Sequence, residues 1–310
     1  MRYRVFGQTG FTVSTVSMGS NRLGDPGEDP AQWPPVVHRA LDRGVNFFDT
    51  SNSYNQGRSE AILGETTQSY PKTTYISTKV GVPVETNDFP HRDFSSRTIF
   101  TEVEQSLKRL RRDAIDMYML HSPSVEQLKR EDWAMAFARL KEQGKVRYYG
   151  ISTDSHASGI TAMEMGAQLL QVDYSMLDPT AEDELLPQAR QRNVGVMIRM
   201  PLARGLLTGK FPVGQEIPAN QQWRRPAGEA LQRRLRRIEQ LRFLERGGQT
   251  LGQAAIRFVL ANPAVHCAIP GARTVQQLED NVSAADGDLT ADELVRIREL
   301  QAKWRAEGQW

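Results

Sequence analysis

The architecture of this chain is clearest in the segment Val45-Asn46-Phe47-Phe48-Asp49-Thr50-Ser51-Asn52-Ser53-Tyr54-Asn55-Gln56-Gly57-Arg58. It begins as a short apolar run without helical spacing, which is typical of a strand buried on both faces. The run ends at Asp49, and a turn rich in Ser and Asn follows before a helix that starts near Ser59. A carboxylate at the end of a buried strand is costly unless it has a partner. Asp49 therefore either caps the turn or meets polar groups from neighbouring strands.

Short apolar runs alternate with helical segments along nearly the whole chain. After a β-hairpin between Arg2 and Val13, we expect strands at Val16–Gly19, Val45–Asp49, Thr74–Lys79, Ile115–His121, Val146–Ser152, Leu169–Tyr174, Val194–Met200 and Val265–Ile269. The helices between them include Ala31–Arg43, Thr98–Leu110, Val125–Gln143, Glu182–Arg192 and Gln249–Leu260. Eight strand–helix units over about 250 residues predict a parallel (β/α)8 TIM barrel. No Gly-x-Gly-x-x-Gly motif follows the first strand, which argues against the two-half dinucleotide fold.

The pattern predicts a single domain over residues 1–310, because no linker, low-complexity tract or short repeat interrupts it. A long loop and an extra helix are expected at about residues 206–246, on the face where barrel enzymes carry their chemistry. The helix, Ala230–Arg246, has an apolar stripe beside six arginines, and we interpret its basic face as solvated because glutamates dilute the charge. A C-terminal helix over Thr290–Trp304 opens with a capping-box pattern. We expect it to pack across the barrel and to leave Gln301–Trp310 as a tail.

Composition limits the classes of function. The formal net charge of +2 over 310 residues creates no global field that would favour nucleic acid or an anionic membrane. No stretch approaches the roughly 18 to 20 apolar residues of a membrane span, and the N-terminus lacks the apolar core of a signal peptide. The one cysteine, Cys267, suits a reducing compartment and lies in an apolar run, which predicts a buried inert thiol. We expect a cytoplasmic protein with no nucleic-acid or membrane partner, and the oligomeric state stays open.

Polar side chains occupy equivalent places at the ends of three consecutive strands. Asp49 ends the second strand with Tyr54 in its loop, Lys79 ends the third, and His121 ends the fourth. Adjacent strands lie about 4.8 Å apart, so these side chains should converge at the C-terminal face of the barrel. Each has an ordinary explanation alone, because Lys79 can reach water, Tyr54 can be a loop aromatic and His121 can cap a helix. Together they fit one chemistry.

That chemistry is proton transfer to a carbonyl oxygen. A phenol, with an ordinary pKa of about 10, is a poor acid at pH 7. An ammonium about 4 Å away favours the phenolate by roughly 4 kcal/mol at an effective dielectric of 20. Asp49 would neutralise and hold Lys79, and a neutral His121 would donate an N–H to a substrate oxygen. Such a site protonates an alkoxide as it forms, as reduction of a carbonyl by hydride requires.

These residues carry a resemblance to the aldo-keto reductases, through Phe47-Phe48-Asp49-Thr50 with Tyr54, Ser77-Thr78-Lys79 and Leu120-His121-Ser122-Pro123. The resemblance spans Gly19 to Asn281 and implies a barrel that uses NADPH, or less often NADH, to reduce aldehydes and ketones. It implies a catalytic tetrad of Asp49, Tyr54, Lys79 and His121, with Tyr54 as general acid. Asn21 stands where many relatives have Trp, and Asn21, Tyr54 and His121 would face a small-molecule carbonyl substrate.

The same resemblance implies where a nicotinamide dinucleotide would bind. Ser152, Thr153 and Gln171 would hold the carboxamide, with Thr153 in place of the usual Asn. Arg199 stands where many relatives have a tyrosine that stacks on the ring; a guanidinium can also lie flat on a ring, or it can simply pair with a carboxylate. The full implied set is Gly19, Ser20, Asp49, Ser152, Thr153, Gln171, Arg199, Met200, Pro201, Leu202, Arg204, Gly205, Leu207, Gly271, Ala272, Arg273, Gln277, Asp280 and Asn281.

The segment Ile269–Asn281 resembles the family's adenosine-phosphate segment and opens a helix, whose N-terminus suits a phosphate. Arg273 would grip a 2′-phosphate, which favours NADP(H). NAD(H) stays open, because Gly271-Ala272 and Gln277 stand where many relatives have Lys-Ser and Arg. We expect no metal site, since no clustered ligand spacing is present. Two alternatives remain: an aldolase with a Schiff base at Lys79, and a nucleotide-binding sensor or partner-binding barrel with little turnover.

Overall fold

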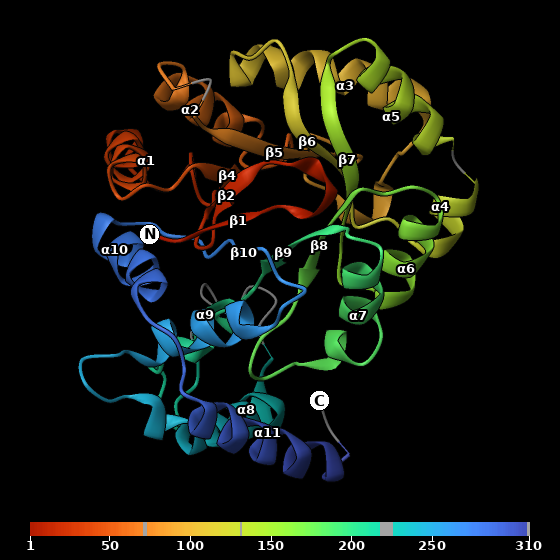
Figure 1. Ribbon diagram of the computed structural model, residues 1–310. Helices are drawn as coiled ribbons and strands as arrows, with labels where there is room; N and C mark the ends of the chain where they lie inside the picture. Colours follow the sequence, from red (N-terminus) through yellow and green to blue (C-terminus); the bar gives the residue numbers. More distant parts are fainter. Residues whose placement is uncertain (71–72, 131, 218–225, 309–310) are drawn as a thin grey trace.

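The computed structural model describes residues 1–70, 73–130, 132–217 and 226–308. In this part of the chain eight parallel strands follow one another around a barrel (Figure 1). They are β3 (Met18–Gly19), β4 (Phe47–Asp49), β5 (Tyr75–Val80), β6 (Ile115–His121), β7 (Val146–Thr153), β8 (Leu169–Asp173), β9 (Gly195–Arg199) and β10 (Cys267–Ala268). Bridges from Val16 to Ala268 and from Gly19 to Gly271 join the first strand to the last. The predicted (β/α)8 barrel is confirmed.

Helices surround the barrel (Figure 1). They are α1 (Trp33–Asp42), α2 (Arg58–Thr67), α3 (Ser96–Leu110), α4 (Val125–Arg130), α5 (Trp133–Glu142), α6 (His156–Glu164), α7 (Leu185–Gln191), α9 (Leu251–Ala261) and α10 (Val275–Val282). The expected single helix over Val125–Gln143 is two helices, α4 and α5. The indole of Trp133, at the start of α5, donates back to the carbonyl oxygen of Leu128 in α4 at 3.1 Å. This hydrogen bond joins α4 to α5.

The predicted N-terminal hairpin is present, and it closes the base of the barrel. Strands β1 (Tyr3–Val5) and β2 (Thr12–Ser14) pair antiparallel, and Phe6 and Val13 are fully buried among residues of the barrel interior. Gly195 in β9 leaves space for the Phe6 ring of the hairpin, because a Cβ atom added there would lie 2.3 Å from that ring. The base is therefore apolar and sealed, and the opposite end of the barrel is left for polar groups.

Strand alternation decides which side chains face the barrel interior. Near the base these are apolar, and they include Phe47, Met117, Leu169, Met197 and Cys267. Two or four residues further along β4 to β9, side chains on the same side are polar. These residues at the strand ends are Asp49, Lys79, His121, Ser152, Gln171 and Arg199. The alternation therefore gathers the predicted site residues inside one end of the barrel.

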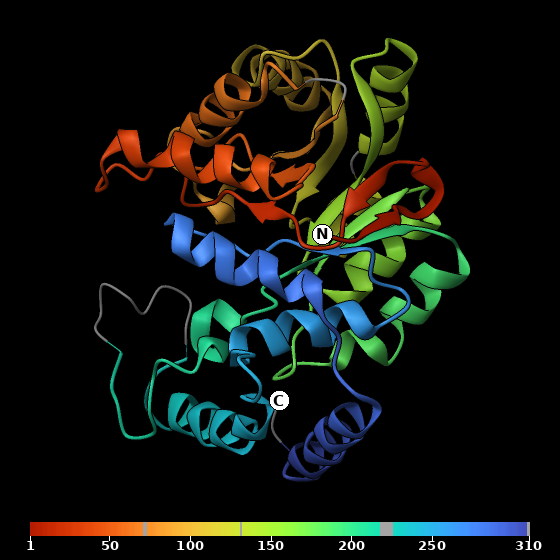
Figure 2. The same ribbon diagram turned by 60° about the vertical axis from the view of Figure 1, so that its left-hand side comes forward.

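Two C-terminal helices, α8 (Gly228–Gln240) and α11 (Ala291–Ala306), lie together outside the ring (Figures 1 and 2). The predicted capping box between Thr290 and Glu293 is present. The expected tail from residue 301 is instead a continuation of α11, in which Trp304 is buried and its ring lies 5.3 Å from the Arg237 guanidinium. This contact fastens α11 to α8.

The basic helix is shorter than predicted, because α8 ends at Gln240 and a separate 3-10 turn covers Arg242–Leu244. Its charge is partly neutralised by nearby carboxylates: Arg236 pairs with Glu229, Arg242 with Glu239 and Glu245, and Arg246 beyond the turn with Glu293. None of the helices in the described ranges has both the length and the apolar character that crossing a bilayer requires.

Candidate active site

A buried ion pair lies at the centre of the site. Lys79, at the end of β5, is fully buried, and its Nζ lies 2.8 Å from Asp49 Oδ2 and 3.0 Å from Oδ1. The same nitrogen donates to the carbonyl oxygen of Thr50 at 2.6 Å. A buried ammonium needs a partner in this way, because its hydration is lost. The Asp49 carboxylate and the Thr50 carbonyl oxygen together supply the partners of this ammonium.

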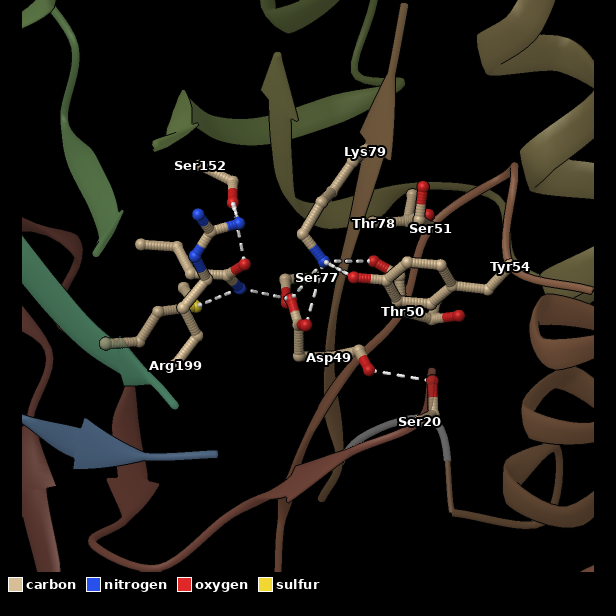
Figure 3. Close-up of polar contacts among 12 residues, drawn as sticks. Ser20, Asp49, Thr50, Ser51, Tyr54, Ser77, Thr78, Lys79, Ser152 and Arg199 are labelled. Atoms are coloured by element: carbon tan, nitrogen blue, oxygen red, sulfur yellow. Dashed lines mark hydrogen bonds and ion pairs between the residues drawn. The ribbon is translucent and has the colours of Figure 1, made fainter. Parts of the chain in front are cut away.

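Tyr54 faces this pair from the loop after β4 (Figure 3). Its Oη lies 3.5 Å from Lys79 Nζ, and its ring edge meets the His121 imidazole with ring centroids 5.8 Å apart. Tyr54 is half-buried, whereas Asp49, Lys79 and His121 are buried. The four residues predicted from the strand ends therefore come together in one place.

His121 has two neighbours that the sequence patterns did not reveal. Ser51 Oγ lies 3.2 Å from Nδ1, and the Phe89 ring packs edge-on with its centroid 4.9 Å from the imidazole. Ser51 lies in the polar turn after β4, but nothing in a run of Ser and Asn shows which hydroxyl points inward. Phe89 comes from the connection after β5, where no periodicity marks it. These contacts orient the imidazole ring.

The Asp49 carboxylate is also the end of a hydrogen-bonded chain across the barrel. Its Oδ1 accepts from Ser77 Oγ and from Gln171 Nε2, each at 2.7 Å, and Gln171 Oε1 accepts from Ser152 Oγ at 2.8 Å. Ser77 lies two residues before Lys79, so strand alternation was the signal that places both on the same side. Four strands thus contribute to one polar network.

Arg199 lies beside this network (Figure 3). Its Nη1 lies 3.4 Å from Ser152 Oγ, its Nε contacts the Asp173 carboxylate, and its Nη2 lies 4.0 Å from Asp154 Oδ2. Burial lowers the pKa of the Arg199 guanidinium, but attraction to Asp173, with smaller effects from other groups, outweighs burial and raises that pKa overall. The Arg199 side chain therefore pairs with Asp173 and also contacts the Ser152 hydroxyl.

The hydroxyl groups of two other predicted residues are engaged within the fold. Thr153 Oγ1 accepts from the backbone N–H of Ser155 at 2.9 Å, just before α6. Ser20 is fully buried, and its Oγ donates to the carbonyl oxygen of Asp49 at 2.7 Å. These hydroxyls hold the loops beside the site.

The segment after β9 has an unusual backbone. Met200, Ala203 and Arg204 have φ angles of 57°, 47° and 60°, in the left-handed region that residues other than glycine rarely adopt. Such strain is retained where the surroundings over-determine it, frequently at ligand clamps. The predicted residues Pro201, Leu202, Gly205 and Leu207 belong to the same turn-rich segment.

The second predicted phosphate segment begins beside the barrel mouth, because Gly271 bridges to Gly19 at the end of β3. Thr274 caps α10, Gln277 Oε1 accepts from the Arg273 backbone N–H at 2.8 Å, and Asn281 Nδ2 donates to the Gly271 carbonyl at 3.2 Å. The remaining predicted members are placed as follows: Ala272 is buried, Asp280 accepts from Gln276, and the Asn21 side chain faces Gly271. The Arg273 side chain is 45% exposed, with Nη1 3.9 Å from Glu28 Oε1.

Cys267 lies at the opposite end of the barrel, fully buried, and burial raises the pKa of its thiol. It is thus the inert cysteine that was predicted. Across residues 1–70, 73–130, 132–217 and 226–308, no group of three or more His, Cys, Asp or Glu side chains is arranged to hold a metal ion.

Comparison with known proteins agrees with the barrel fold. The model of the Aldo/keto reductase family matches residues 15–302. The uncharacterized oxidoreductase YrpG of Bacillus subtilis (strain 168) is 33% identical over 326 residues, covering 97% of this chain and 96% of the relative. The solved structure of aldo-keto reductase AKR11C1 from Bacillus halodurans, in its holo form, is similar with a TM-score of 0.83 and 28% identity over 97% of this chain and 96% of that one. Glycerol dehydrogenase AKR11B4 from Gluconobacter oxydans has a TM-score of 0.84 and 28% identity over 94% and 93%. This chain belongs to the aldo/keto reductase family.

Proposed function

We propose that this protein reduces an aldehyde or ketone to an alcohol by hydride transfer from NADPH, with Tyr54 as the general acid. The observation that carries the proposal is the contact of 3.5 Å between Tyr54 Oη and the Nζ of Lys79, which is itself paired with Asp49. An ammonium beside a phenol stabilises the negative charge that the oxygen gains when it gives up its proton. The family supports nucleotide-dependent carbonyl reduction in general, and the roles of the residues are our proposal.

The residues at the barrel mouth fit a nicotinamide dinucleotide. The Gln171 amide and the Ser152 hydroxyl are buried at adjacent strand ends and would bind a carboxamide, with the planar Arg199 guanidinium beside them. The segment from Met200 to Leu207 and the one from Gly271 to Asn281 would hold the phosphates through backbone N–H groups and arginines. When bound, the dinucleotide would supply the hydride that reduces the carbonyl carbon.

The side chains of the chain would carry the proton. His121 Nε2 donates to the substrate oxygen, provided that Ser51 Oγ donates to Nδ1 and so sets that tautomer. As negative charge grows on this oxygen, Tyr54 transfers its hydroxyl proton to it, and the alcohol forms. Lys79 stabilises the resulting phenolate, Asp49 holds Lys79 in place, and solvent returns a proton to Tyr54. Together with Asn21, these groups would line the substrate site.

The choice between NADPH and NADH rests on Arg273. Its exposed guanidinium beside the start of α10 suits a 2′-phosphate, which NADH lacks. One relative, from Escherichia coli (strain K12), bears the name NADH-specific methylglyoxal reductase and is 28% identical over 324 residues. We therefore propose NADP(H) as the preferred cofactor and treat NAD(H) as the competitor to be measured.

The test is a fluorescence titration of the purified protein with NADPH and with NADH, followed by turnover assays on aldehydes and ketones. We expect tighter binding of NADPH and oxidation of bound NADPH by at least one carbonyl. Trapping with borohydride that labels Lys79 in the presence of substrate would instead indicate an aldolase. Tight nucleotide binding without turnover would favour a sensor or partner-binding role; two relatives, 29% and 30% identical, are named potassium channel subunits beta.

We further propose that residues 1–310 act as one domain. The bridges from Val16 to Ala268 and from Gly19 to Gly271 support this, because they join the first strand of the barrel to the last. We propose a cytoplasmic location on the ground of the single cysteine in the sequence.

A further inference from the structure

A buried carboxylate lies behind the loop that carries Tyr54. Glu60, in the first turn of α2, is fully buried, which a glutamate almost never is unless it is paired. Its Oε1 accepts from Thr78 Oγ1 at 2.5 Å, and its Oε2 accepts from Arg109 Nε at 2.6 Å. Neither contact involves the side chains of the proposed catalytic tetrad, so the proposed chemistry leaves this group unexplained.

The contact with Thr78 reaches the strand that carries Lys79. Thr78 and Lys79 are consecutive in β5, so their side chains leave opposite faces of the sheet. Lys79 points into the barrel, where it meets Asp49, whereas Thr78 is directed toward the surrounding helices. The hydrogen bond from Thr78 therefore joins the strand of Lys79 to the helix that follows the Tyr54 loop.

The contact with Arg109 reaches the loop itself. Gly57 is the last residue before α2, with a φ angle of +81°, and a Cβ atom added there would lie 2.8 Å from Arg109 Cδ. The Arg109 side chain, from α3, thus packs directly against the end of the loop. Asn52, in the same loop, donates to Glu102 of α3 at 3.2 Å. The loop is consequently fastened to α3 at two points.

We propose that Glu60 is a positioning residue that sets the separation of the Tyr54 phenol oxygen from the Lys79 ammonium. It acts through Thr78 on β5 and through Arg109 on the loop, without touching substrate or cofactor. Removing one partner of a buried ion pair would leave an uncompensated charge, so Glu60 and Arg109 hold each other at short range, with Arg109 Nε 2.6 Å from Glu60 Oε2. The inference rests on the proposed role of Tyr54 as the acid.

Thr78 offers a matched pair of variants. Thr78→Val has nearly the same shape but lacks the hydroxyl donor, and we expect its kcat to fall roughly tenfold or more, because small displacements of reacting groups are costly. Its KM and its Kd for NADPH should stay within about twofold, since no binding group is changed. Thr78→Ser keeps the donor and should retain kcat within about threefold of the parent. Thr78→Ala, a smaller residue without the donor, should repeat the fall if the valine variant does not fold.

Thr66→Val is the control for loss of a buried threonine hydroxyl. Thr66 is also a buried residue of α2, and its hydroxyl donates to the Ile62 carbonyl oxygen at 2.7 Å within the same helix. This variant loses a comparable bond that does not reach β5 or the loop, so we expect unchanged kcat. An equal fall of kcat in the Thr66 and Thr78 variants would show general loosening of α2 and would overturn the proposal.

A second readout does not depend on turnover. Crystal structures of the variants report directly on the separation of Tyr54 Oη from Lys79 Nζ, which is 3.5 Å in the parent. This separation should change in Thr78→Val, because the hydrogen bond from Thr78 to Glu60 is lost, and it should be preserved in Thr78→Ser. An unchanged separation in Thr78→Val would overturn the proposal. A parent that binds NADPH but reduces no carbonyl would refute the proposed function alone, since this distance still reports on positioning.

Discussion

Gln171 Nε2 donates to Asp49 Oδ1 at 2.7 Å across the barrel, from β8 to β4, two strands that are not neighbours in the sheet. Both side chains are buried, and the other end of the amide accepts from Ser152. Residues that we assign to the nucleotide and residues that we assign to proton transfer are thus one hydrogen-bonded unit. A substitution at Gln171 should therefore affect both.

Gln171→Met keeps the length of the side chain but removes both the donor and the acceptor. We expect NADPH to bind roughly tenfold more weakly and kcat to fall by a similar factor, because one hydrogen bond to a charged group is worth about 1.5 kcal/mol or more. Ser152→Ala is the comparison, since it touches the amide but not Asp49, and its kcat should change less. Binding titrations and steady-state kinetics separate the two effects. A loss of nucleotide affinity with parental kcat in both variants would contradict the coupling.

Tyr54→Phe removes the proposed acid and leaves the ring. We expect carbonyl reduction to fall by about 10³-fold, within the usual range for loss of a general acid. The Kd for NADPH should change by less than about threefold, because the phenol oxygen is not among the residues assigned to the nucleotide. Tyr70→Phe, at an exposed tyrosine on the surface, serves as the control. Activity equal to that of the parent would remove Tyr54 as the acid.

Arg273→Ala tests recognition of the 2′-phosphate. The guanidinium is exposed near Glu28, so it is available to an incoming anion. We expect the Kd for NADPH to rise roughly tenfold or more and the Kd for NADH to stay nearly constant, because charge-assisted bonds to a phosphate are strong. Glu28→Gln, which removes a competing carboxylate, should leave NADPH binding equal or tighter. A parallel loss for both nucleotides would show that Arg273 does not read the 2′-phosphate.

His266 makes the barrel base sensitive to acid. Its ring packs on Phe6 with centroids 5.3 Å apart, and Nδ1 accepts from the Val196 N–H at 3.0 Å. Burial lowers the pKa of His266 from 6.5 to about 4. Since the unfolded chain then binds more protons between these values, the free energy of unfolding falls as pH drops from about 6.5 toward 4.

His266→Asn isolates this contribution, because the amide oxygen can still accept from Val196 but does not titrate. Between pH 7 and pH 5 the parent should lose about 2 kcal/mol more stability than the variant, as one pKa unit corresponds to about 1.4 kcal/mol. Urea unfolding of both proteins at each pH measures the difference. Parallel pH profiles would mean that His266 titrates alike in the folded and unfolded states.

Much of the candidate site could be predicted from the sequence, because its residues lie at the ends of strands that are consecutive in the chain. A polar residue that ends an apolar run must lie at the mouth of a parallel barrel, and consecutive strands must be neighbours. This reasoning alone predicted the positions of Asp49, Lys79 and His121. Tyr54 was predicted because it lies in the short loop that follows Asp49. Ser77 was within reach of the same reasoning, since it lies on the same side of β5 as Lys79.

The three-dimensional fold was needed to choose the partners. Ser77 and Ser20 are both fully buried, but their hydroxyls have different partners. Ser77 donates to the Asp49 carboxylate, whereas Ser20 donates to a backbone carbonyl oxygen. The bond from Gln171 to Asp49 spans the barrel, and Glu60 meets Thr78 and Arg109 from two other elements. Such pairings depend on strand register, helix placement and rotamers, which are set by packing over the whole molecule. Residue type and spacing along the chain therefore do not predict these pairings.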